Sequence, residues 1–210
     1  MLKKRVVNTP QENQQALIDA VLTPFGKELE TILPDVSFNP AWVKASVIYG
    51  AANKYAEEKN YKDAIPAYVK AAKAFEDAAS ASKGETQLSA NYQLASCHYK
   101  LTRLYHIRLT KKVSGVDKKG FQESFDALNK VKSKIQFKLK KDKPKMLRLY
   151  LKTGDASLWA SSHDFYADTL KKRHLANANK DLEQVVPDGE VSPEDKSIFA
   201  AALRSRVRVL

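Results

Sequence analysis

The stretch that decides the fold is Ala51–Ala78, which reads AANKYAEEKNYKDAIPAYVKAAKAFEDA. Small alanines recur between aromatic residues throughout it. A helix that only had to cover a core would use leucine, so these alanines predict helices that approach one another unusually closely. The polar pair Lys59-Asn60 lies near the middle and predicts a turn. Two antiparallel helices joined by this turn are therefore expected.

Start and stop signals predict an all-α chain of about seven or eight helices. Capping boxes at Thr9–Glu12 and Ser192–Asp195 mark two helix starts, because their side chains bond to free backbone N–H groups. Loops are expected at 111–120 and 138–145, and an interruption near Thr153–Asp155. The expected helices span about 10–21, 24–33, 40–58, 62–79, 85–109, 121–135, 146–185 and a last stretch from 193.

Composition agrees with one compact helical body. The 210 residues are 43% hydrophobic and 29% charged, which excludes wholesale disorder. We expect N-terminal helices over 1–39, a repeat body over 40–185, and a C-terminal helix over 186–210 packed on the same domain. The single Cys97 excludes an internal disulfide, and no apolar run reaches the length of a membrane span. A cytoplasmic protein without a transmembrane segment is the expectation.

The helix pair resembles a tetratricopeptide repeat. The residues that carry the likeness are Ala51, Ala52, Tyr55, Asn60, Tyr61, Ala64, Ile65, Tyr68 and Ala71. In that family small residues let one helix approach the next, while aromatics fill the holes between successive pairs. The resemblance implies antiparallel helix pairs in a right-handed superhelix. It departs from the family at the turn, where Lys59 stands in place of glycine, and at Glu76, where proline is usual.

Two related families share this likeness. A weaker second copy begins at Tyr92 and places Ala95 43 residues after Ala52, which exceeds the 34-residue period of the ordinary repeat. Such lengthened hairpins are similar to those of the SNAP family of SNARE-complex adaptors, over about 47–101. The segment Lys59–Phe75 also has a weak likeness to MIT domains. The alternative is that an alanine-rich helix pair has converged on this pattern.

Positive charge is concentrated in one quarter of the chain. Residues 1–100 hold 12 Lys/Arg and 11 Asp/Glu, residues 101–152 hold 16 and 4, and residues 153–210 hold 8 and 9. The middle segment therefore carries a net +12, and the other two nearly cancel. A segment of one sign favours an acidic partner, although a merely solubilising face is the alternative.

The run that concentrates this charge is the main candidate binding site. It consists of Lys138, Lys140, Lys141, Lys143, Lys145 and Arg148, against a single Asp142. In the tetratricopeptide likeness, Asn53 and Tyr92 are expected to face a groove that binds a peptide. The aromatic residues of the basic segment are expected mostly at buried positions, namely Tyr105, Phe121, Phe125, Phe137 and Tyr150, with Phe125, Leu128, Val131 and Ile135 forming a buried stripe.

Three partner classes fit this charge. An acidic protein surface or peptide is favoured by the repeat architecture, an anionic membrane surface comes next, and nucleic acid is less favoured because no recognised motif accompanies the lysines. The function expected is a non-catalytic protein–protein interaction adaptor, with a role in membrane trafficking as one reading. A lipid- or nucleic-acid-binding helical module is the alternative.

No catalytic site, cofactor or metal is predicted. The chain lacks the phosphate-binding motifs GxxxxGK[ST] and GxGxxG and the zinc motif HExxH. Cys97-His98 and Ser161–Asp164 contain catalytic residue types, but neighbours on a helix diverge by about 100°. His98, His106, His163 and His174 show no metal-ligand spacing. An enzyme or effector whose site is assembled from scattered residues is the competing hypothesis.

Overall fold

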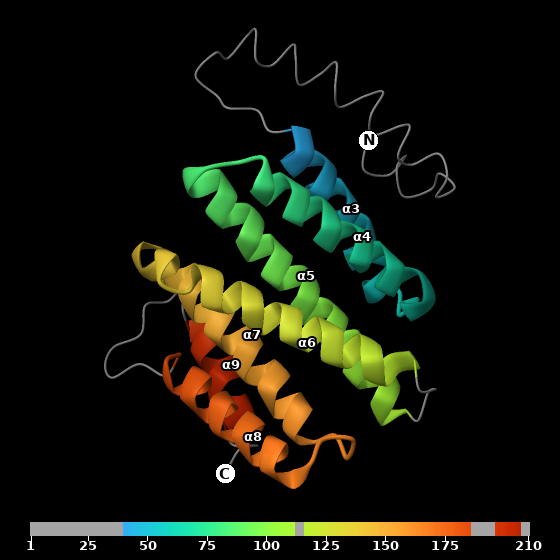
Figure 1. Ribbon diagram of the computed structural model, residues 1–210, viewed down its shortest axis with the longest axis vertical. Coiled ribbons are helices and arrows are strands. Elements are labelled where there is room, and N and C mark those ends of the chain that lie inside the picture. Colours follow the sequence, from blue (N-terminus) through green and yellow to red (C-terminus); the bar gives the residue numbers. More distant parts are fainter. Residues whose placement is uncertain (1–39, 112–115, 186–195, 207–210) are drawn as a thin grey trace, which may run out of the picture. The chain divides into compact units, whose positions relative to one another are not determined.

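The computed structural model describes residues 40–111, 116–185 and 196–206. Within these ranges every regular element is a helix, seven of them α-helices, which confirms the all-α class (Figure 1). The chain divides into two compact units, Met1–Cys97 and His98–Leu210. The superhelical arrangement stays a prediction. The helices expected over 10–21 and 24–33 lie outside the described residues, as do the capping boxes at Thr9 and Ser192.

The first unit contains the helix pair that the opening stretch predicted. Helix α3 spans Pro40–Glu57, α4 spans Tyr61–Ser80, and α5, Gly84–Thr110, begins in this unit. Lys59 adopts the left-handed region, with φ +58°, so it takes the conformation that the glycine of the repeat family would favour. Asn60 caps α4, because its side-chain oxygen accepts a hydrogen bond from the Asp63 backbone N–H at 3.4 Å.

Alanines let the helices of this unit pack closely, as expected. Tyr68 and Phe75 are buried between them, and Tyr49 lies edge-on to both rings at centroid distances of 5.8 and 6.0 Å. Helix α5 joins the pair through Gln87, whose Nε2 donates to the Ala79 carbonyl at 3.1 Å. The alanines buried in this unit are Ala45, Ala51, Ala52, Ala64, Ala67, Ala71, Ala72, Ala78, Ala79, Ala90 and Ala95.

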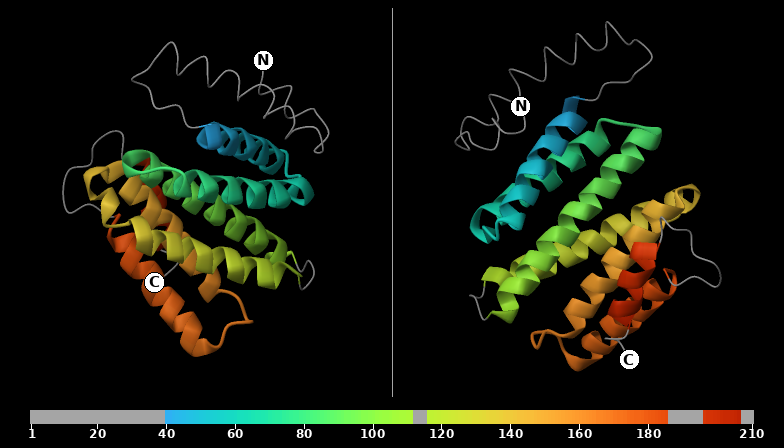
Figure 2. Two further views of the ribbon diagram at one scale, coloured as in Figure 1. Left: turned by 45° about the horizontal axis from the view of Figure 1, so that its top comes forward. Right: turned by 180° about the vertical axis from the view of Figure 1, so that it is seen from behind.

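The second unit is built from five further helical elements and the end of α5. Its elements are α6 (Val116–Ile135), the 3-10 helix η1 (Lys138–Lys141), α7 (Lys143–Ser161), α8 (Asp168–Glu183) and α9 (Lys196–Arg206). Helices α7, α8 and α9 lie side by side in this unit (Figure 2). Their shared core contains Leu147, Leu182, Val185, Ile198, Phe199 and Ala202.

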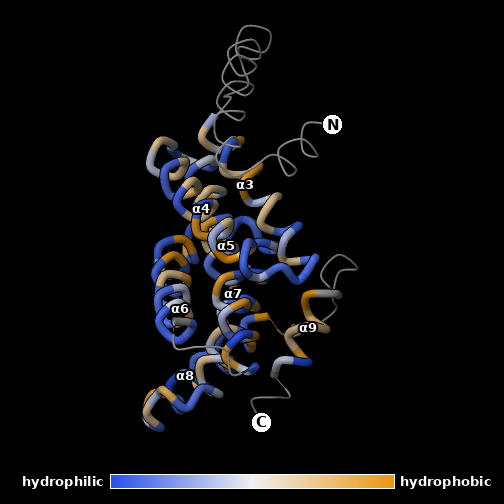
Figure 3. Tube along the Cα trace, turned by 90° about the vertical axis from the view of Figure 1, so that its right-hand side faces the viewer, coloured by the Kyte–Doolittle hydropathy of each residue, from blue (hydrophilic) through white to orange (hydrophobic). Residues whose placement is uncertain are grey.

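Helix α6 is amphipathic, and its apolar stripe is confirmed. Hydrophilic and hydrophobic positions alternate along it in Figure 3. The four predicted stripe residues are all buried, and the spacing continues from Ile135 to Leu139 in η1. These two side chains fix the end of α6 and the start of the next segment to the core. The predicted stripe residues are Phe125, Leu128, Val131 and Ile135.

Three predicted boundaries were wrong. The loop expected at 138–145 is instead η1 followed by the first turn of α7, because Asp142 caps that helix and Pro144 stands where its missing N–H costs nothing. Helix α6 begins at Val116, inside the loop expected at 111–120, where Asp117 is buried and forms an ion pair with Arg108 at 3.0 Å.

The interruption expected near Thr153–Asp155 is also absent, because α7 continues to Ser161 and the break falls at 162–167. Gly154 is buried in that helix at a close approach to α8. A Cβ atom placed on it would lie 2.8 Å from Cγ and Cδ2 of Leu182, which is itself fully buried. The glycine therefore permits a helix contact and does not end the helix.

Because Gly154 is at a close helix approach and Gly50 is not, replacing each with alanine should have opposite effects on stability. Gly154→Ala should lower the free energy of unfolding by about 1–3 kcal/mol, because Leu182 must shift inside a packed core. Gly50→Ala, in α3, should raise it by about 0.4–1 kcal/mol, because a Cβ there meets nothing within 4 Å and alanine restricts the unfolded chain. Urea denaturation of both variants checks the pair. Equal shifts would contradict the packing at Gly154.

Candidate functional site

The predicted cations gather where α6 turns into α7. We define the basic corner as eight side chains of α6, η1 and the start of α7. All are exposed except Lys145, which is half-exposed. In Figure 1 this corner is the gold-coloured turn that joins α6 to α7. The basic corner comprises Lys130, Lys134, Lys138, Lys140, Lys141, Lys143, Lys145 and Arg148.

Backbone geometry explains why these lysines face solvent. Leu139 is 1% exposed and continues the buried stripe of α6, so the lysines on either side of it project away from the core. Asp142 ends η1 and begins α7, and its Oδ1 accepts a hydrogen bond from the Lys145 backbone N–H at 3.1 Å. The corner is therefore an ordered arrangement of helix ends, whose backbone is fixed where the cations are attached.

One carboxylate lies within this segment, and a neighbour neutralises it. Asp142 is the only acidic residue between 127 and 154. Its Oδ2 lies 2.6 Å from Lys145 Nζ, and the side-chain hydrogen bond from this lysine lowers the pKa of Asp142. The remaining seven cations of the basic corner have no acidic residue in this stretch to balance them.

Phe137 lies in the middle of the basic corner and is 70% exposed. Its position was predicted to be buried, which was wrong. The stripe steps four residues from Ile135 to Leu139, so Phe137 falls between two inward-facing positions and turns outward. Lys140 Nζ lies 5.5 Å from the centroid of its ring. The four-residue step from Ile135 to Leu139 was the sequence signal that could have predicted an exposed Phe137.

The two predicted groove residues lie in the other unit. Asn53 Oδ1 accepts a hydrogen bond from the Tyr68 hydroxyl at 2.7 Å, so this oxygen is engaged within the first unit. Tyr92 is 8% exposed. The neighbouring Tyr49 is largely buried, and burial raises its pKa to about 12. The six predicted cations thus belong to the second unit, whereas Asn53 and Tyr92 belong to the first.

Two histidines meet in an aromatic cluster of the second unit. His106 Nδ1 and His163 Nε2 are 3.1 Å apart, and the His106 ring stacks on Trp159 at 5.3 Å. His163 lies between Phe121 and Phe165, at centroid distances of 4.7 and 4.9 Å. Burial, assisted by His106, lowers the pKa of His163 to about 4, so one neutral ring donates to the other at neutral pH.

The other catalytic residue types do not converge on this pair. Ser161 and Ser162 donate to the backbone carbonyls of Leu158 and Trp159, at 2.8 and 2.7 Å. Asp164 is exposed and bonds Lys171 at 2.9 Å. Among the residues that the structure describes, no three His, Cys, Asp or Glu side chains gather as metal ligands would.

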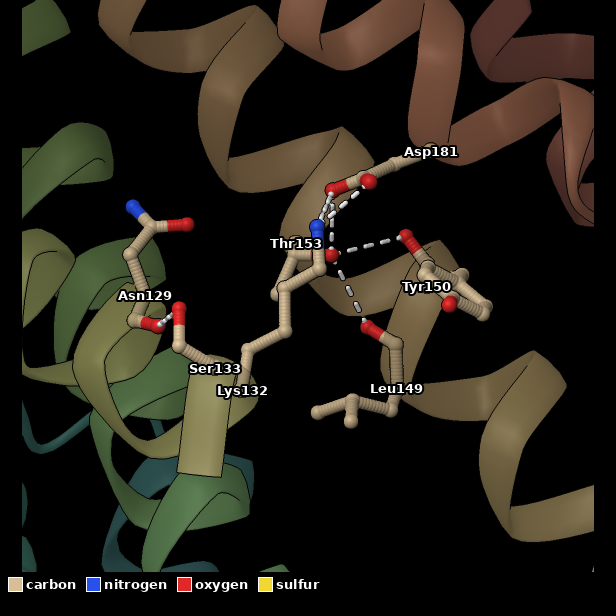
Figure 4. Close-up of polar contacts among 7 residues, drawn as sticks. All are labelled: Asn129, Lys132, Ser133, Leu149, Tyr150, Thr153 and Asp181. Atoms are coloured by element: carbon tan, nitrogen blue, oxygen red, sulfur yellow. Dashed lines mark hydrogen bonds and ion pairs between the residues drawn. The ribbon is translucent and has the colours of Figure 1, made fainter. Parts of the chain in front are cut away.

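A buried ion pair links three helices of the second unit, and the sequence analysis missed it (Figure 4). Lys132 of α6 bonds both carboxylate oxygens of Asp181 of α8, with Oδ2 at 2.6 Å. The Thr153 hydroxyl of α7 donates to the same Oδ2 at 2.6 Å, and Lys132 Nζ lies 5.3 Å from the Tyr150 ring centroid. Lys132 stands four residues after Leu128, on the buried stripe, and this spacing was the available signal.

The ion pair has the character of a structural connection. Its lysine and aspartate side chains are 16% and 7% exposed, and both carboxylate oxygens are occupied. The lysine ammonium is held by the carboxylate, and the carboxylate is held by Lys132 and Thr153, so each group is engaged in a contact between helices. We therefore assign Lys132 and Asp181 to holding α6, α7 and α8 together, and we exclude Lys132 from the basic corner.

Comparisons with family models, with curated proteins and with solved structures found no match for this chain. In the ranges 40–111, 116–185 and 196–206, no helix combines the length and apolar character that a bilayer crossing requires. Function must accordingly be inferred from the chemistry of the chain's own residues. Within the second unit, the basic corner is the surface where exposed charge of one sign is concentrated.

Proposed function

We propose that this protein is a non-catalytic helical adaptor that docks on an acidic partner through the basic corner. The observation that carries the proposal is the set of seven exposed cations around one carboxylate that Lys145 already neutralises. Groups of this kind attract acidic surfaces over several ångströms and accelerate their encounter. The tetratricopeptide likeness of the first unit also favours an adaptor. A cytoplasmic location agrees with the single cysteine of the chain, Cys97, which excludes an internal disulfide.

The position of these lysines in α7 supports a binding role. A helix N-terminus carries a partial positive charge, so cations in the first turn are unfavourable there. Helix α7 nevertheless has no acidic residue in its first turn and places Lys143 and Lys145 in it. Lys145 gains an ion pair with Asp142 there, whereas local stability would favour aspartate or glutamate in place of Lys143. Residues that oppose a local rule without a packing benefit are commonly explained by function.

A charge reversal at the corner tests this proposal. The corner variant carries glutamate at Lys138, Lys140, Lys141 and Lys143 and should bind acidic partners about tenfold to a hundredfold more weakly than the parent. It should fold equally well, because these side chains are exposed. The measurement is capture from a lysate, with bound proteins and bound lipids both quantified, at low and raised salt.

A control variant of the same net charge makes the comparison specific. Each lysine-to-glutamate change lowers the charge by two, so four changes take either variant from +12 to +4. The control variant carries them at four exposed lysines elsewhere and should retain the parent's partners. Equal binding by a well-folded corner variant would show that the corner only solubilises the protein. The control positions are Lys62, Lys70, Lys83 and Lys172.

A further inference from the structure

An exposed aromatic ring surrounded by lysines is the feature of the corner that its charge alone does not explain. Phe137 is 70% exposed, the largest exposed fraction among the described large hydrophobic residues with substantial exposure. It lies between α6 and η1, where Ile135 and Leu139 are both 1% exposed and hold the backbone to the core. The ring is therefore presented outward from an anchored segment.

The chemistry around this ring matches a membrane interface. Lys140 Nζ lies 5.5 Å from the Phe137 ring centroid, so a cation and an apolar surface are presented side by side. At a bilayer surface an apolar side chain enters the headgroup boundary while lysine stems extend back to the phosphates. Lys138 and Lys141 are also exposed within four residues of Phe137 in the chain and can reach the same phosphates.

We propose that the basic corner docks on an anionic lipid bilayer and that Phe137 inserts between the headgroups. This inference rests on the proposed function, because it names the acidic partner of the same surface. Lysine-rich clusters bind anionic leaflets through diffuse electrostatic attraction, without a fixed partner geometry. Phe137 adds the apolar contact that makes such binding depend on insertion as well as on charge.

The kind of cation present favours a bilayer over a protein. Seven of the eight cations of the basic corner are lysines, and Arg148 is the exception. Lysine is a point charge that suits mobile headgroups, whereas arginine is preferred for paired contacts with a carboxylate of fixed position. Lysine is also depleted in the buried centres of protein interfaces. An acidic protein of defined shape is thus the less suitable occupant.

Nucleic acid is disfavoured for a different reason. Single strands are held by successive aromatic side chains on which neighbouring bases stack. Among residues 130–148 Phe137 is the only aromatic side chain. One exposed ring provides one stacking position, which does not define a path for a strand.

Vesicle flotation tests the inference with the full chain. The parent should float with vesicles of phosphatidylcholine and phosphatidylserine and remain unbound with phosphatidylcholine alone, because attraction needs anionic lipid. Phe137→Ala should bind the anionic vesicles about tenfold more weakly, since its apolar contact is lost. Leu203→Ala, at a side chain that is 51% exposed on α9, should bind as the parent does. The corner variant should remain unbound.

A tryptophan at the same position reports insertion directly. Phe137→Trp should retain binding, and its added fluorescence should shift to the blue and become shielded from acrylamide when anionic vesicles are present, because the indole leaves water. Unchanged binding by Phe137→Ala would overturn the inference, and so would an indole that stays accessible in the bound state.

Soluble probes distinguish failure of this inference from failure of the proposed function. If polyglutamate binds in a corner-dependent manner while anionic vesicles do not, the bilayer assignment is overturned and the adaptor proposal stands. Corner-dependent binding of single-stranded RNA in place of polyglutamate and vesicles would overturn both proposals. If the corner variant and the control variant bind every probe equally, both proposals are overturned. Circular dichroism of each variant confirms that the fold is retained.

Discussion

Asp181→Ala is expected to lower the free energy of unfolding of the second unit by about 3–5 kcal/mol, because it leaves the Lys132 ammonium buried without its counter-charge. The Thr153 hydroxyl also loses its shortest hydrogen bond, of 2.6 Å, although the Leu149 and Tyr150 carbonyls remain 3.2 Å away. Urea denaturation followed by circular dichroism measures the loss.

Two further variants show whether the unpaired charge is the cause. Replacing both partners, Lys132→Met with Asp181→Leu, should recover most of the stability, because an apolar pair of similar size needs no counter-charge. Asp164→Ala removes the exposed ion pair with Lys171 and should leave the unfolding curve nearly unchanged. A double variant as unstable as Asp181→Ala would contradict the assignment to charge.

Acidification is expected to destabilise the second unit between pH 6.5 and about 4. Burial, with a smaller contribution from His106, lowers the pKa of His163 from 6.5 to about 4, and burial also lowers the pKa of His106 and of His174. The unfolded chain therefore binds more protons in this window, so the free energy of unfolding falls as the pH falls. His163 alone should account for a fall in the free energy of unfolding on the order of 2 kcal/mol, a figure reduced to allow for solvent screening of the ring.

A ring replacement isolates this contribution. His163→Phe retains the stacking position beside Phe165 and removes the proton-binding nitrogen, so its stability should vary less with pH between 6.5 and 4. Asp164→Asn is the control, because this exposed carboxylate affects the pKa of His163 less than burial and His106 do. Unfolding free energies measured at several pH values give both slopes. A His163→Phe slope equal to the parent's would contradict the role of this histidine.

Local patterns were sufficient for much of the fold. The alanine and aromatic spacing of Ala51–Ala78 predicted two closely packed helices, and the structure confirms α3 and α4 with buried alanines between them. The stripe from Phe125 to Ile135 was equally readable. Both patterns repeat every three or four residues along one helix, so their meaning does not depend on distant parts of the chain.

The candidate site was predicted in part. The run Lys138–Arg148 was identified from charge alone, and the structure places its side chains at the surface, where an unpaired lysine avoids the cost of desolvation. Phe137 was expected among aromatic residues that are mostly buried, but it lies between α6 and η1, off the stripe that steps from Ile135 to Leu139, and is 70% exposed. The tetratricopeptide likeness and the adaptor function stay predictions.

Sequence by itself therefore determined the all-α class, the alanine-packed helix pair and the existence of the basic run, because each depends on neighbouring residues. Only the tertiary structure decided that a glycine and a lysine, residues that local rules place at helix ends and on the surface, belong to the core. Gly154 lies inside α7, where the absence of a Cβ leaves room for Leu182 of α8. Lys132 is largely buried, unlike the exposed lysines around it, because Asp181 supplies its counter-charge. These outcomes depend on partners 28 and 49 residues away, and no local pattern specifies such pairings.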